Sequence, residues 1–591
     1  VYGDDPWSDS TQVPADSRFI SRHLYIPVIE PADVQEVKDY VDLSFKLSRR
    51  SELIAGLLLT TNLADGGGTV MCRPNQYPDI NTRNKVDLAT RSIDLDKRVL
   101  LPPKTWWQEE SYTQRFERAM AAARELGLNR LEHPAPAAAR RAVGFVTSGL
   151  AYGYLVQALH EMGQLGRYPI LKLGMSYPVD PVLIRQLAGQ CERIVVVEER
   201  RSFMEEQIHE LVARDRQDGR CLRRRHHHRD PKDGRCEAAS VEVWGKRFPN
   251  GLPGLPETRG LHPSILIAQL ASLLKEVSAP GQRIAVPAEY EALDRELETI
   301  DATAQGELSS APPRVPTFCP GCPHRDSASV CLEVKKAFMD PAYMAKAHAR
   351  GPVDLLFHGD TGCYTMLMFP PTTQLMHDYS GMGLGAGTGS GIDPFIRNKE
   401  VVFMGDSTFF HSGQIAISHA IKIGQDITFI ILDNSTTAMT GHQPTPGVDY
   451  DILGNRTPKQ DIEEIVRGMA PDIRQVPVVR ADPEKRKQYR QLLEKTFLAD
   501  GVKVIIADKE CGITRTRRRR RIERKLIRAN GFLPVSQHTG INQDICRFCL
   551  ACAEQTGCPG LKHVETDYGA KMDTSLSNCV NDGACMRVQA C

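Results

Sequence analysis

The segment from Val401 to Pro444 constrains the fold more than any other part of the chain. It reads VVFMGDSTFFHSGQIAISHAIKIGQDITFIILDNSTTAMTGHQP, with apolar runs at Val401–Met404 and Ile427–Leu432. Two short apolar runs separated by a helical pattern predict buried parallel strands joined by a covering helix. Ser412 is a candidate cap for that helix, which we expect to end near Ile423. The sequence therefore predicts an α/β fold with a doubly wound parallel sheet.

Polar residues follow each of these two strands. Gly405, Asp406 and Ser407 come after the first strand, and Asp433 and Asn434 come after the second. Both loops leave the same edge of an open parallel sheet, so the side-chain oxygens of Asp406 and Asn434 can converge there. Such oxygens suit Mg²⁺, which keeps waters and binds diphosphate. Gly405 lets the backbone approach phosphate, and the helix start adds N–H donors. A similar crossover that binds no ligand is the alternative interpretation.

Alternating strand and helix patterns also occur in the first half of the chain. Apolar runs at Val143–Thr147, Ile170–Leu173 and Ile194–Val197 predict strands, and Tyr152–Met162 predicts a helix between the first two. This alternation favours a mostly parallel sheet covered by helices. Nearer the start, Asp33 is expected to begin a helix.

Length and composition are those of a globular protein with several domains. The 591 residues are 41% hydrophobic and 25% charged, and the net charge is +1. The near-zero net charge gives no field that would attract nucleic acid or an acidic membrane. No apolar run approaches the roughly 18 residues of a membrane span. We therefore expect a cytoplasmic enzyme with no nucleic-acid or membrane partner.

Cysteine residues are concentrated near the end of the chain. Seven of the sixteen lie in the last 46 residues. In a large chain without a secretory signal, clustered C-x2-C spacings favour metal binding over disulfides. ICRFCLACAEQTGCP has the C-x2-C-x2-C-x5-C-P pattern of an iron–sulfur motif, in which the cysteine before proline serves the other cluster. The expected ligands of the first cluster are Cys546, Cys549, Cys552 and Cys591.

The second half of this motif is irregular. In CVNDGACMRVQAC, Asp582 stands three residues after Cys579, where a regular motif has cysteine. We expect the second cluster to use Cys558, Cys579 and Cys585, with Asp582 as a fourth ligand or with an incomplete site. A zinc ribbon is the alternative, although zinc favours two widely separated ligand pairs.

Two basic runs and a proline-rich stretch are interpreted as connectors. The arginines and histidines of residues 223–229 lie between Cys221 and Cys236, and their charge favours a solvated loop over a metal site. Arg517–Arg521 is a second basic run, for which RNA or an acidic protein is the alternative to a solvated connector. Pro312–Pro316 is expected to be an interdomain linker.

Several motifs in the second half resemble a known enzyme family. The segment that begins with GDS at Gly405 and ends with DNSTTAMTGHQP resembles the thiamine-diphosphate motif. TFCPGCPHR at Thr317–Arg325 and GDTGCYTM at Gly359–Met366 are similar to the start of the diphosphate-binding domain of indolepyruvate ferredoxin oxidoreductases. The glycine-rich GMGLGAGTGSG, Gly381–Gly391, precedes GDS. The chain thus resembles the large (alpha) subunit of this thiamine-diphosphate-dependent 2-oxoacid:ferredoxin oxidoreductase family.

The upstream half fits the same resemblance. GDDPWSDSTQVPADSR, from Gly3 to Arg18, is similar to the late part of the family's pyrimidine-binding domain. TSGLAYGY, LKLGMSYPVD and VVVEERRSFMEEQ resemble its transketolase-C-like domain. The glutamate that activates the aminopyrimidine in this family is expected before Val1. Because the sequence also stops on Cys591 within a cysteine motif, we expect a fragment at both ends.

The resemblance implies roles for residues around GDS. Asp406 and Asn434 are the implied Mg²⁺ ligands, and Thr436 would contribute its backbone carbonyl. Met382 is a candidate for the apolar support of the thiazolium ring or for an ordinary core residue. Three residues are candidates for acid–base work or carboxylate binding near the reacting carbon, with a structural or phosphate-side role as the alternative. They are His324, Arg325 and His442.

A third iron–sulfur cluster is implied beside the thiamine site. By order and context, four cysteines match those that hold a cluster there in pyruvate-type relatives. They are Cys319, Cys322, Cys363 and Cys511. The alternative for CPGCPHR is a tight turn with two structural cysteines. The five other cysteines receive no role.

The reaction implied by the resemblance is oxidative decarboxylation of an aryl 2-oxoacid with coenzyme A. The products would be acyl-CoA and CO₂, with electrons leaving through the [4Fe-4S] clusters to ferredoxin. The expected partners are ferredoxin, a smaller beta- or gamma-type subunit that is separate or fused, and a second copy of this chain. A non-redox thiamine-diphosphate-dependent decarboxylase and a zinc-binding scaffold or nucleic-acid-binding protein are the alternatives.

The predicted organisation has seven parts. Residues 1–69 are the end of the pyrimidine-binding domain, 70–141 a connecting region and 142–248 the transketolase-C-like domain. Residues 249–314 are a linker and 315–515 the diphosphate-binding domain. Residues 516–541 are a basic linker, and 542–591 are an incomplete ferredoxin-like α+β domain.

Overall fold

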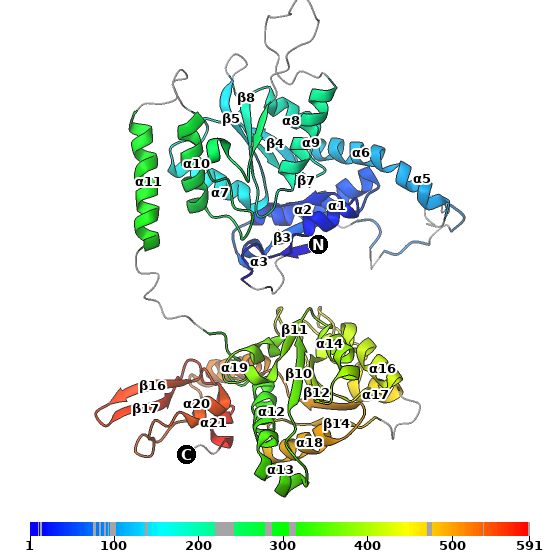
Figure 1. Cartoon of the computed structure of the whole chain (residues 1–591), viewed down its shortest axis with the longest axis vertical. Helices are drawn as coiled ribbons and strands as arrows, with labels where there is room; N and C mark the ends of the chain where they lie inside the picture. Colours follow the sequence, from blue (N-terminus) through cyan, green and yellow to red (C-terminus); the bar gives the residue numbers. More distant parts are fainter. Residues whose placement is uncertain are drawn as a thin grey trace, which may run out of the picture. The chain divides into compact units, whose positions relative to one another are not determined.

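The computed structural model divides the chain into two compact units, Val1–Ala311 and Pro312–Cys591 (Figure 1). The structure describes residues 1–9, 11, 15–74, 78–81, 84–87, 90–92, 94, 102–135, 140–218, 241–277, 287–305, 315–469, 476–535 and 537–588. The histidine-rich run 223–229, Cys221, Cys236 and Cys591 therefore lie outside the described residues.

The first unit contains two sheets. The four-stranded sheet has the order β1-β3-β2-β7, with parallel pairs except for β2 and β7. The five-stranded sheet has the order β4-β6-β5-β8-β9, and only β4 runs antiparallel to its neighbour. The strands are β1 (Tyr2–Asp4), β2 (Val28–Ile29), β3 (Gly56–Thr60), β4 (Asn129–Glu132), β5 (Arg141–Ser148), β6 (Ile170–Leu173), β7 (Met175–Tyr177), β8 (Cys191–Val197) and β9 (Glu242–Trp244).

Helices cover both faces of the five-stranded sheet. Phe145 and Val195 face a core that includes α7 and α10, whereas Val146 and Val196 face a core that includes α8 and α9. This alternation of neighbouring residues is what a doubly wound sheet requires. The helices of this unit are α1 (Ser17–His23), α2 (Val34–Ser51), α3 (Thr61–Asp65), α5 (Lys104–Glu110), α6 (Tyr112–Glu125), α7 (Gly149–Glu161), α8 (Pro181–Ala188), α9 (Met204–Gln217), α10 (Pro263–Val277) and α11 (Pro287–Gln305).

The strands and helices expected in this half are present. β5, β6 and β8 cover the three predicted strands, and α7 covers the predicted helix between the first two. Asp33 caps α2, because its Oδ1 accepts a hydrogen bond from the Glu36 N–H at 2.8 Å.

The prediction that residues 249–314 form a linker is wrong for much of that range. Helix α10 packs against α7, and Leu266, Leu270 and Leu273 are fully buried. An amphipathic helix with such an apolar stripe is a core element. The predicted domain boundary near residue 141 is also not a structural division, because β7 of the next segment pairs with β2.

The second unit is built on a six-stranded, all-parallel sheet with the order β11-β10-β12-β13-β15-β14. Val401 and Phe403 face the core formed with α12 and α18, and Val402 and Met404 face the core formed with α14, α16 and α17. The expected doubly wound sheet is thus confirmed. Its strands are β10 (Leu355–Asp360), β11 (Asp378–Ser380), β12 (Lys399–Gly405), β13 (Ile427–Asp433), β14 (Val478–Ala481) and β15 (Lys503–Asp508).

The helix after β12 begins earlier than predicted. It starts at Asp406, and Ser412 lies within a π-helical turn, Phe409–Gly413, so Ser412 is not a cap. The helices of this unit are α12 (Pro323–Met339), α13 (Pro341–His348), α14 (Gly385–Ile392), α15 (Asp406–Thr408), α16 (Gln414–Ile423), α17 (Ile462–Gly468), α18 (Arg486–Leu498), α19 (Gly512–Asn530), α20 (Ala551–Thr556) and α21 (Ala584–Arg587).

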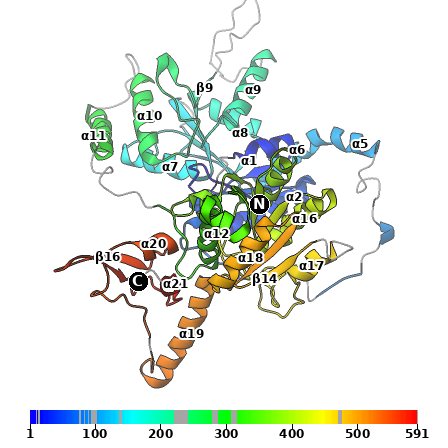
Figure 2. The same cartoon turned by 60° about the horizontal axis from the view of Figure 1, so that its bottom comes forward.

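The end of the chain forms a small α+β region of the second unit. The hairpin of β16 (Leu561–Thr566) and β17 (Gly569–Thr574) is antiparallel, and α20 packs against α12. The predicted basic linker 516–541 is largely helical, because Arg517–Arg521 lie in α19, which projects from the second unit (Figure 2). Within the described residues, no helix is long and apolar enough to cross a membrane.

Candidate cofactor site

Asp406 and Asn434 lie together at the carboxyl edge of the six-stranded sheet. β12 and β13 are neighbours, with Gly405 opposite Leu432, so the two loops start side by side. The backbone N–H of Thr436 lies 3.1 Å from Asp406 Oδ2 and 3.1 Å from Asn434 Oδ1. The two side-chain oxygens therefore flank one N–H group, which is the convergence that the strand order predicts.

His324 fixes the orientation of the Asn434 amide. Asn434 Nδ2 lies 2.9 Å from His324 Nε2, and both residues are buried. Burial lowers the pKa of His324 to about 4, so the imidazole is neutral and Nε2 can accept a hydrogen bond from Nδ2. This contact leaves Asn434 Oδ1 on the side of Asp406.

Asp406 is a buried carboxylate that fits a cation site. It is 2% exposed, and in the described part of the chain it forms no ion pair with a basic side chain. Burial and the nearby Asp433 raise the pKa of Asp406 to about 8. The N–H of Ser407 donates to Asp406 Oδ1 at 2.9 Å, which holds the carboxylate in place. Carboxylate and amide oxygens form a donor set of the type that Mg²⁺ prefers.

Four cysteines line a cavity of about 280 Å³ that also reaches His324 and Asn434. Burial and the neighbouring Cys511 and Cys319 raise the pKa of Cys363 to about 12. A tight turn brings Cys322 N to 3.1 Å from Cys319 O, and Cys511 N donates to Asn434 O at 3.1 Å. The cysteines on the cavity wall are Cys319, Cys322, Cys363 and Cys511.

The C-terminal cysteines are predicted to form two further groups. Cys546, Cys549 and Cys552 line a cavity of about 310 Å³, whose wall also includes Cys585. Burial raises the pKa of Cys585, and the neighbouring Cys558, Asp582 and Cys579 raise it further. Among the described residues, no three or more His, Cys, Asp or Glu side chains are already arranged to hold a metal ion.

The other predicted residues lie around this edge in different surroundings. Arg325 pairs with Asp326 at 3.1 Å and with Asp582 at 2.6 Å. His442 Nδ1 lies 3.2 Å from Thr514 Oγ1 in the first turn of α19. Met382 is 41% exposed, on the loop between β11 and α14.

Sequence reasoning missed a buried group beside Gly405. Asp360, at the end of β10, accepts hydrogen bonds from the Tyr364 hydroxyl and, at 2.9 Å, from the Gly383 N–H. Burial raises the pKa of Asp360 to about 6. The Tyr364 hydroxyl also lies 3.4 Å from Thr408 Oγ1. The available signal was the Gly-Asp pair of GDTGC, which repeats the Gly-Asp at the end of β12.

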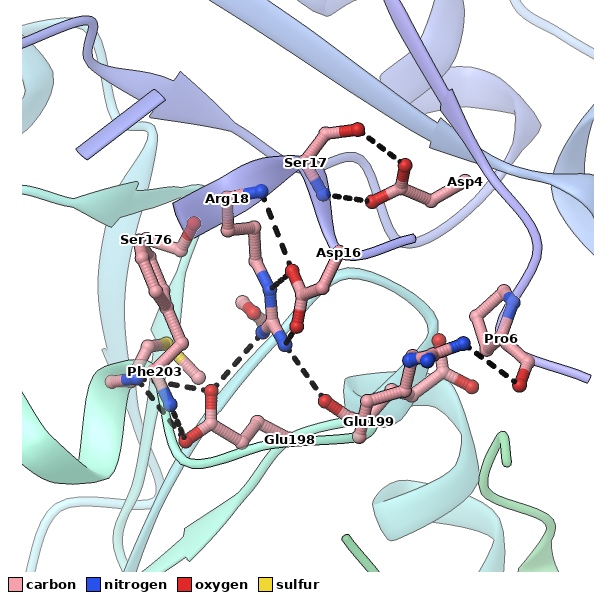
Figure 3. A network of polar contacts seen from close by, with 12 residues as sticks. Asp4, Pro6, Asp16, Ser17, Arg18, Ser176, Glu198, Glu199 and Phe203 are labelled. Atoms are coloured by element: carbon pink, nitrogen blue, oxygen red, sulfur yellow. Dashed lines mark hydrogen bonds and ion pairs between the residues drawn. The ribbon is translucent and has the colours of Figure 1, made fainter. Parts of the chain in front are cut away.

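The first unit contains a buried polar network centred on Arg18 (Figure 3). Its guanidinium binds Asp16 through two hydrogen bonds of 2.8 Å, and it pairs with Glu198 at 3.1 Å. Glu198 in turn accepts hydrogen bonds from backbone N–H groups at the start of α9. The adjoining cavity, of about 30 Å³, has room for about one water molecule. The network thus ties the ADSR segment to the VVVEERR segment.

Two family models match parts of the chain. Residues 360–507 match "Thiamine pyrophosphate enzyme, C-terminal TPP binding domain". Residues 135–234 match "Indolepyruvate oxidoreductase domain". The first match runs from the last residue of β10 into β15 and so includes Asp406 and Asn434.

Curated relatives match over the full chain. Indolepyruvate oxidoreductase subunit IorA of Archaeoglobus fulgidus is 27% identical, over 100% of this chain and 79% of the relative. IorA of Pyrococcus abyssi is 27% identical, over 100% of this chain and 80% of the relative. Among solved structures, 2-oxoglutarate:ferredoxin oxidoreductase from Magnetococcus marinus aligns with a TM-score of 0.28 and 17% identity, over 35% of this chain and 68% of that chain.

Proposed function

We propose, from the premise that this chain belongs to the family of indolepyruvate oxidoreductase large subunits, that it catalyses oxidative decarboxylation of aryl 2-oxoacids. The acyl acceptor would be coenzyme A and the electron acceptor ferredoxin. One observation carries the proposal most strongly. The buried Asp406–Asn434 pair adjoins a cavity lined by four cysteines.

The residues of the sheet edge suit thiamine diphosphate and Mg²⁺. When bound, the cofactor supplies a thiazolium that accepts the electrons left by departing CO₂. Asp406, Asn434 and the carbonyl of Thr436 would hold the cation, and Gly405 and Ser407 would lie against the diphosphate. His324 would position Asn434 through the Nδ2–Nε2 hydrogen bond. Met382 and His442 remain candidates for contacts with the reacting part of the cofactor and substrate.

The cysteines suit an enzyme that must remove electrons. Thiolates are the ligands of iron–sulfur clusters, and the cavity beside Asn434 has four cysteines on its wall. The two C-terminal groups would hold two more clusters in the same unit. A non-redox decarboxylase releases no electrons and would need none of these ligands, so the eleven cysteines of the three sets favour the oxidoreductase.

The proposal includes partners and a location. A smaller subunit, ferredoxin and a second copy of this chain are the proposed partners. A cytoplasmic location is proposed with them.

The direct test uses the complete protein purified with its smaller subunit in the absence of oxygen. Viologen reduction would be measured with a panel of aryl and branched 2-oxoacids, each with and without coenzyme A and thiamine diphosphate. We expect reduction that requires substrate, coenzyme A and thiamine diphosphate. An iron-loaded and thiamine-loaded protein that reduces no viologen but releases CO₂ would instead support the non-redox decarboxylase.

The cluster beside the thiamine site has a separate test. Cys363→Ser should lower the iron content by about four atoms per chain, because one thiolate of a [4Fe-4S] cluster is lost. Cys72→Ser is the matched control, since Cys72 is exposed and belongs to no cysteine group. Equal iron content in both variants would reject the cluster at this cavity.

A further inference from the structure

Asp582 stands where the second iron–sulfur motif would have its middle cysteine. Cys579 and Cys585 are its neighbours in the motif, and Cys558 lies beside Cys579, because a Cβ on Gly560 would lie 3.3 Å from Cys579 Cα and 3.5 Å from Cys558 Sγ. A carboxylate at this position can either bind iron or bind something else. Its Oδ1 accepts a hydrogen bond from the Ala584 N–H at 3.5 Å.

Both the side chain and the backbone of Asp582 are engaged by arginines. Asp582 Oδ2 lies 2.6 Å from Arg325 Nη2, and the Asp582 carbonyl accepts a hydrogen bond from Arg587 Nη1 at 2.6 Å. The Arg325 side chain is 3% exposed and the Asp582 side chain 12%. A buried guanidinium that loses its carboxylate is strongly unfavourable, so this pair resists separation.

The pair is part of a chain of ion pairs that leads from Arg325 to Arg587, which contacts the Asp582 carbonyl. Arg325 also contacts Asp326 at 3.1 Å, and Asp326 pairs with Lys509 at 2.5 Å. Lys509 pairs with Glu484 at 3.1 Å, and Glu484 pairs with Arg587 at 2.6 Å. The set connects the start of α12, the loop after β15, the loop before α18, and α21. Asp582 therefore anchors the cysteine-rich end of the chain to the sheet unit.

We propose that Asp582 is the permanent partner of Arg325 and does not ligate iron, so that the second C-terminal cluster has three protein ligands, Cys558, Cys579 and Cys585. The inference rests on the proposed function, because it requires that this group holds a cluster. The fourth iron of such a cluster would be bound by solvent or a small exogenous ligand. A one-electron oxidant such as ferricyanide would release that iron, [4Fe-4S]²⁺ → [3Fe-4S]⁺ + Fe²⁺ + e⁻, with the electron going to the oxidant.

The same geometry gives Arg325 a positioning role. Its Nη2 contacts both Asp582 and Asp326, so we assign this side chain to holding the cysteine-rich region. Arg325 follows His324 directly, so adjacent residues of α12 contact Asn434 of the thiamine site and Asp582 of the cluster site.

The test is electron paramagnetic resonance of the complete protein, purified without oxygen and treated with limited ferricyanide. We expect the [3Fe-4S]⁺ signal at about one spin per chain in the unmodified protein. Added Fe²⁺ with a reductant should remove the signal. In Asp582→Cys the signal should disappear, because a fourth thiolate retains the iron. Asp567→Cys, at the exposed tip of the β16–β17 hairpin, is the control that should keep the signal.

The Asp582→Asn variant separates the two roles of the carboxylate. If Asp582 is not a ligand, this substitution leaves the signal present, as in the unmodified protein. An unmodified protein without the signal, together with an Asp582→Asn variant that gains it, would overturn the inference by showing that Asp582 binds iron. If Asp582→Cys does not fold, the double variant Asp582→Cys, Arg325→Met is used instead. It removes the buried positive charge that would otherwise lack its carboxylate partner.

Failure of the inference and failure of the proposed function give different results. A protein that takes up no iron–sulfur clusters at all rejects the proposed function. A protein that contains clusters, reduces viologen and yields no [3Fe-4S]⁺ signal rejects only the three-ligand site.

Discussion

At the scale of single residues, the candidate thiamine site depends on one buried carboxylate and the groups that hold it. Asp406 is nearly inaccessible, and the N–H groups of Ser407 and Thr436 fix its two oxygens. Such a carboxylate is unfavourable without a cation, because burial penalises its charge. We therefore expect Asp406 to bind a cation more tightly than a surface aspartate would.

Replacing Asp406 should remove cation-dependent cofactor binding. Asp406→Ala is expected to weaken Mg²⁺–thiamine diphosphate binding by about 100-fold or more, because an anionic ligand is lost from a buried site. Calorimetric titration would measure the affinity. Asp567→Ala on the exposed hairpin is the control. Unchanged affinity in Asp406→Ala would contradict the assignment of the cation site.

His324 is expected to act through Asn434. His324→Ala removes the acceptor that orients the Asn434 amide, and loss of such an outer partner typically costs about 10–100-fold in metal affinity. The measurement is Mg²⁺ affinity at fixed thiamine diphosphate, with iron content as a second readout. A variant with normal Mg²⁺ affinity and reduced turnover would show instead that His324 serves the reacting carbon.

At the scale of elements, close packing of α14 against β10 shapes the glycine-rich segment. A Cβ at Gly385 would lie 2.6 Å from both the carbonyl carbon and the oxygen of Gly359. That neighbour is backbone and cannot rotate away. Gly387, two positions further along the same helix, has open space around the corresponding point.

The two glycines therefore predict opposite effects of the same substitution. Gly385→Ala should destabilise the second unit by about 1–3 kcal/mol, as overpacking does. Gly387→Ala should stabilise it by about 0.5–1 kcal/mol, because alanine favours the helix. Thermal or urea unfolding of the two variants would measure this. Equal effects would contradict the close approach of α14 and β10.

The three strands β11, β10 and β12 also share a buried charged group. His358 Nδ1 lies 2.5 Å from Asp378 Oδ2, and its Nε2 lies 3.3 Å from Glu400 Oε2. Burial lowers the pKa of His358, but the two carboxylates outweigh it and raise the pKa to about 9. His377 and Asp393 are the other titratable groups whose charges act on these residues.

This histidine predicts a pH-dependent stability. A histidine pKa raised above its unfolded value of about 6.5 gives stability that is complete below pH 6.5 and lost as pH rises through about 9. Relative to His358→Gln, the wild-type protein should therefore lose on the order of 2 kcal/mol of unfolding free energy between these limits. Urea unfolding at several pH values would measure the difference. A difference that does not change with pH would show that His358 is neutral.

At the scale of the whole molecule, each unit has its own apolar cores. The three clusters of the first unit lie within residues 1–311, and the three of the second lie within residues 312–591. The sheet edge with Asp406 and Asn434 and the described cysteines of the three proposed cluster sets belong to the second unit. A unit with a complete core is expected to fold without the other.

This arrangement predicts that residues 312–591 fold alone. The segment should be soluble, unfold in one cooperative transition and bind iron when produced without oxygen. Residues 1–311 produced alone are the matched comparison and should contain no iron. An insoluble second segment, or one without a cooperative transition, would show that the units depend on each other for stability.

The sequence by itself determined the local arrangement of the candidate site. Buried strands, a crossover helix and polar residues at two strand ends leave one way to place Asp406 and Asn434, because parallel strands end at the same edge. The positions of five strands followed from their apolar runs. These strands are β5, β6, β8, β12 and β13. The spacing of the C-terminal cysteines likewise predicts metal ligands, and this assignment stays a prediction.

Only the tertiary structure decided what the distant polar residues do. Arg325 and Asp582 are 257 positions apart, and no local pattern signals that they form a buried pair. Two segments predicted as linkers are helical. The apolar face of α10 packs against α7, and α19 is one continuous helix from Gly512 to Asn530. Periodicity specifies which face of an element is apolar, but the partner of a buried charge depends on which elements the fold brings together.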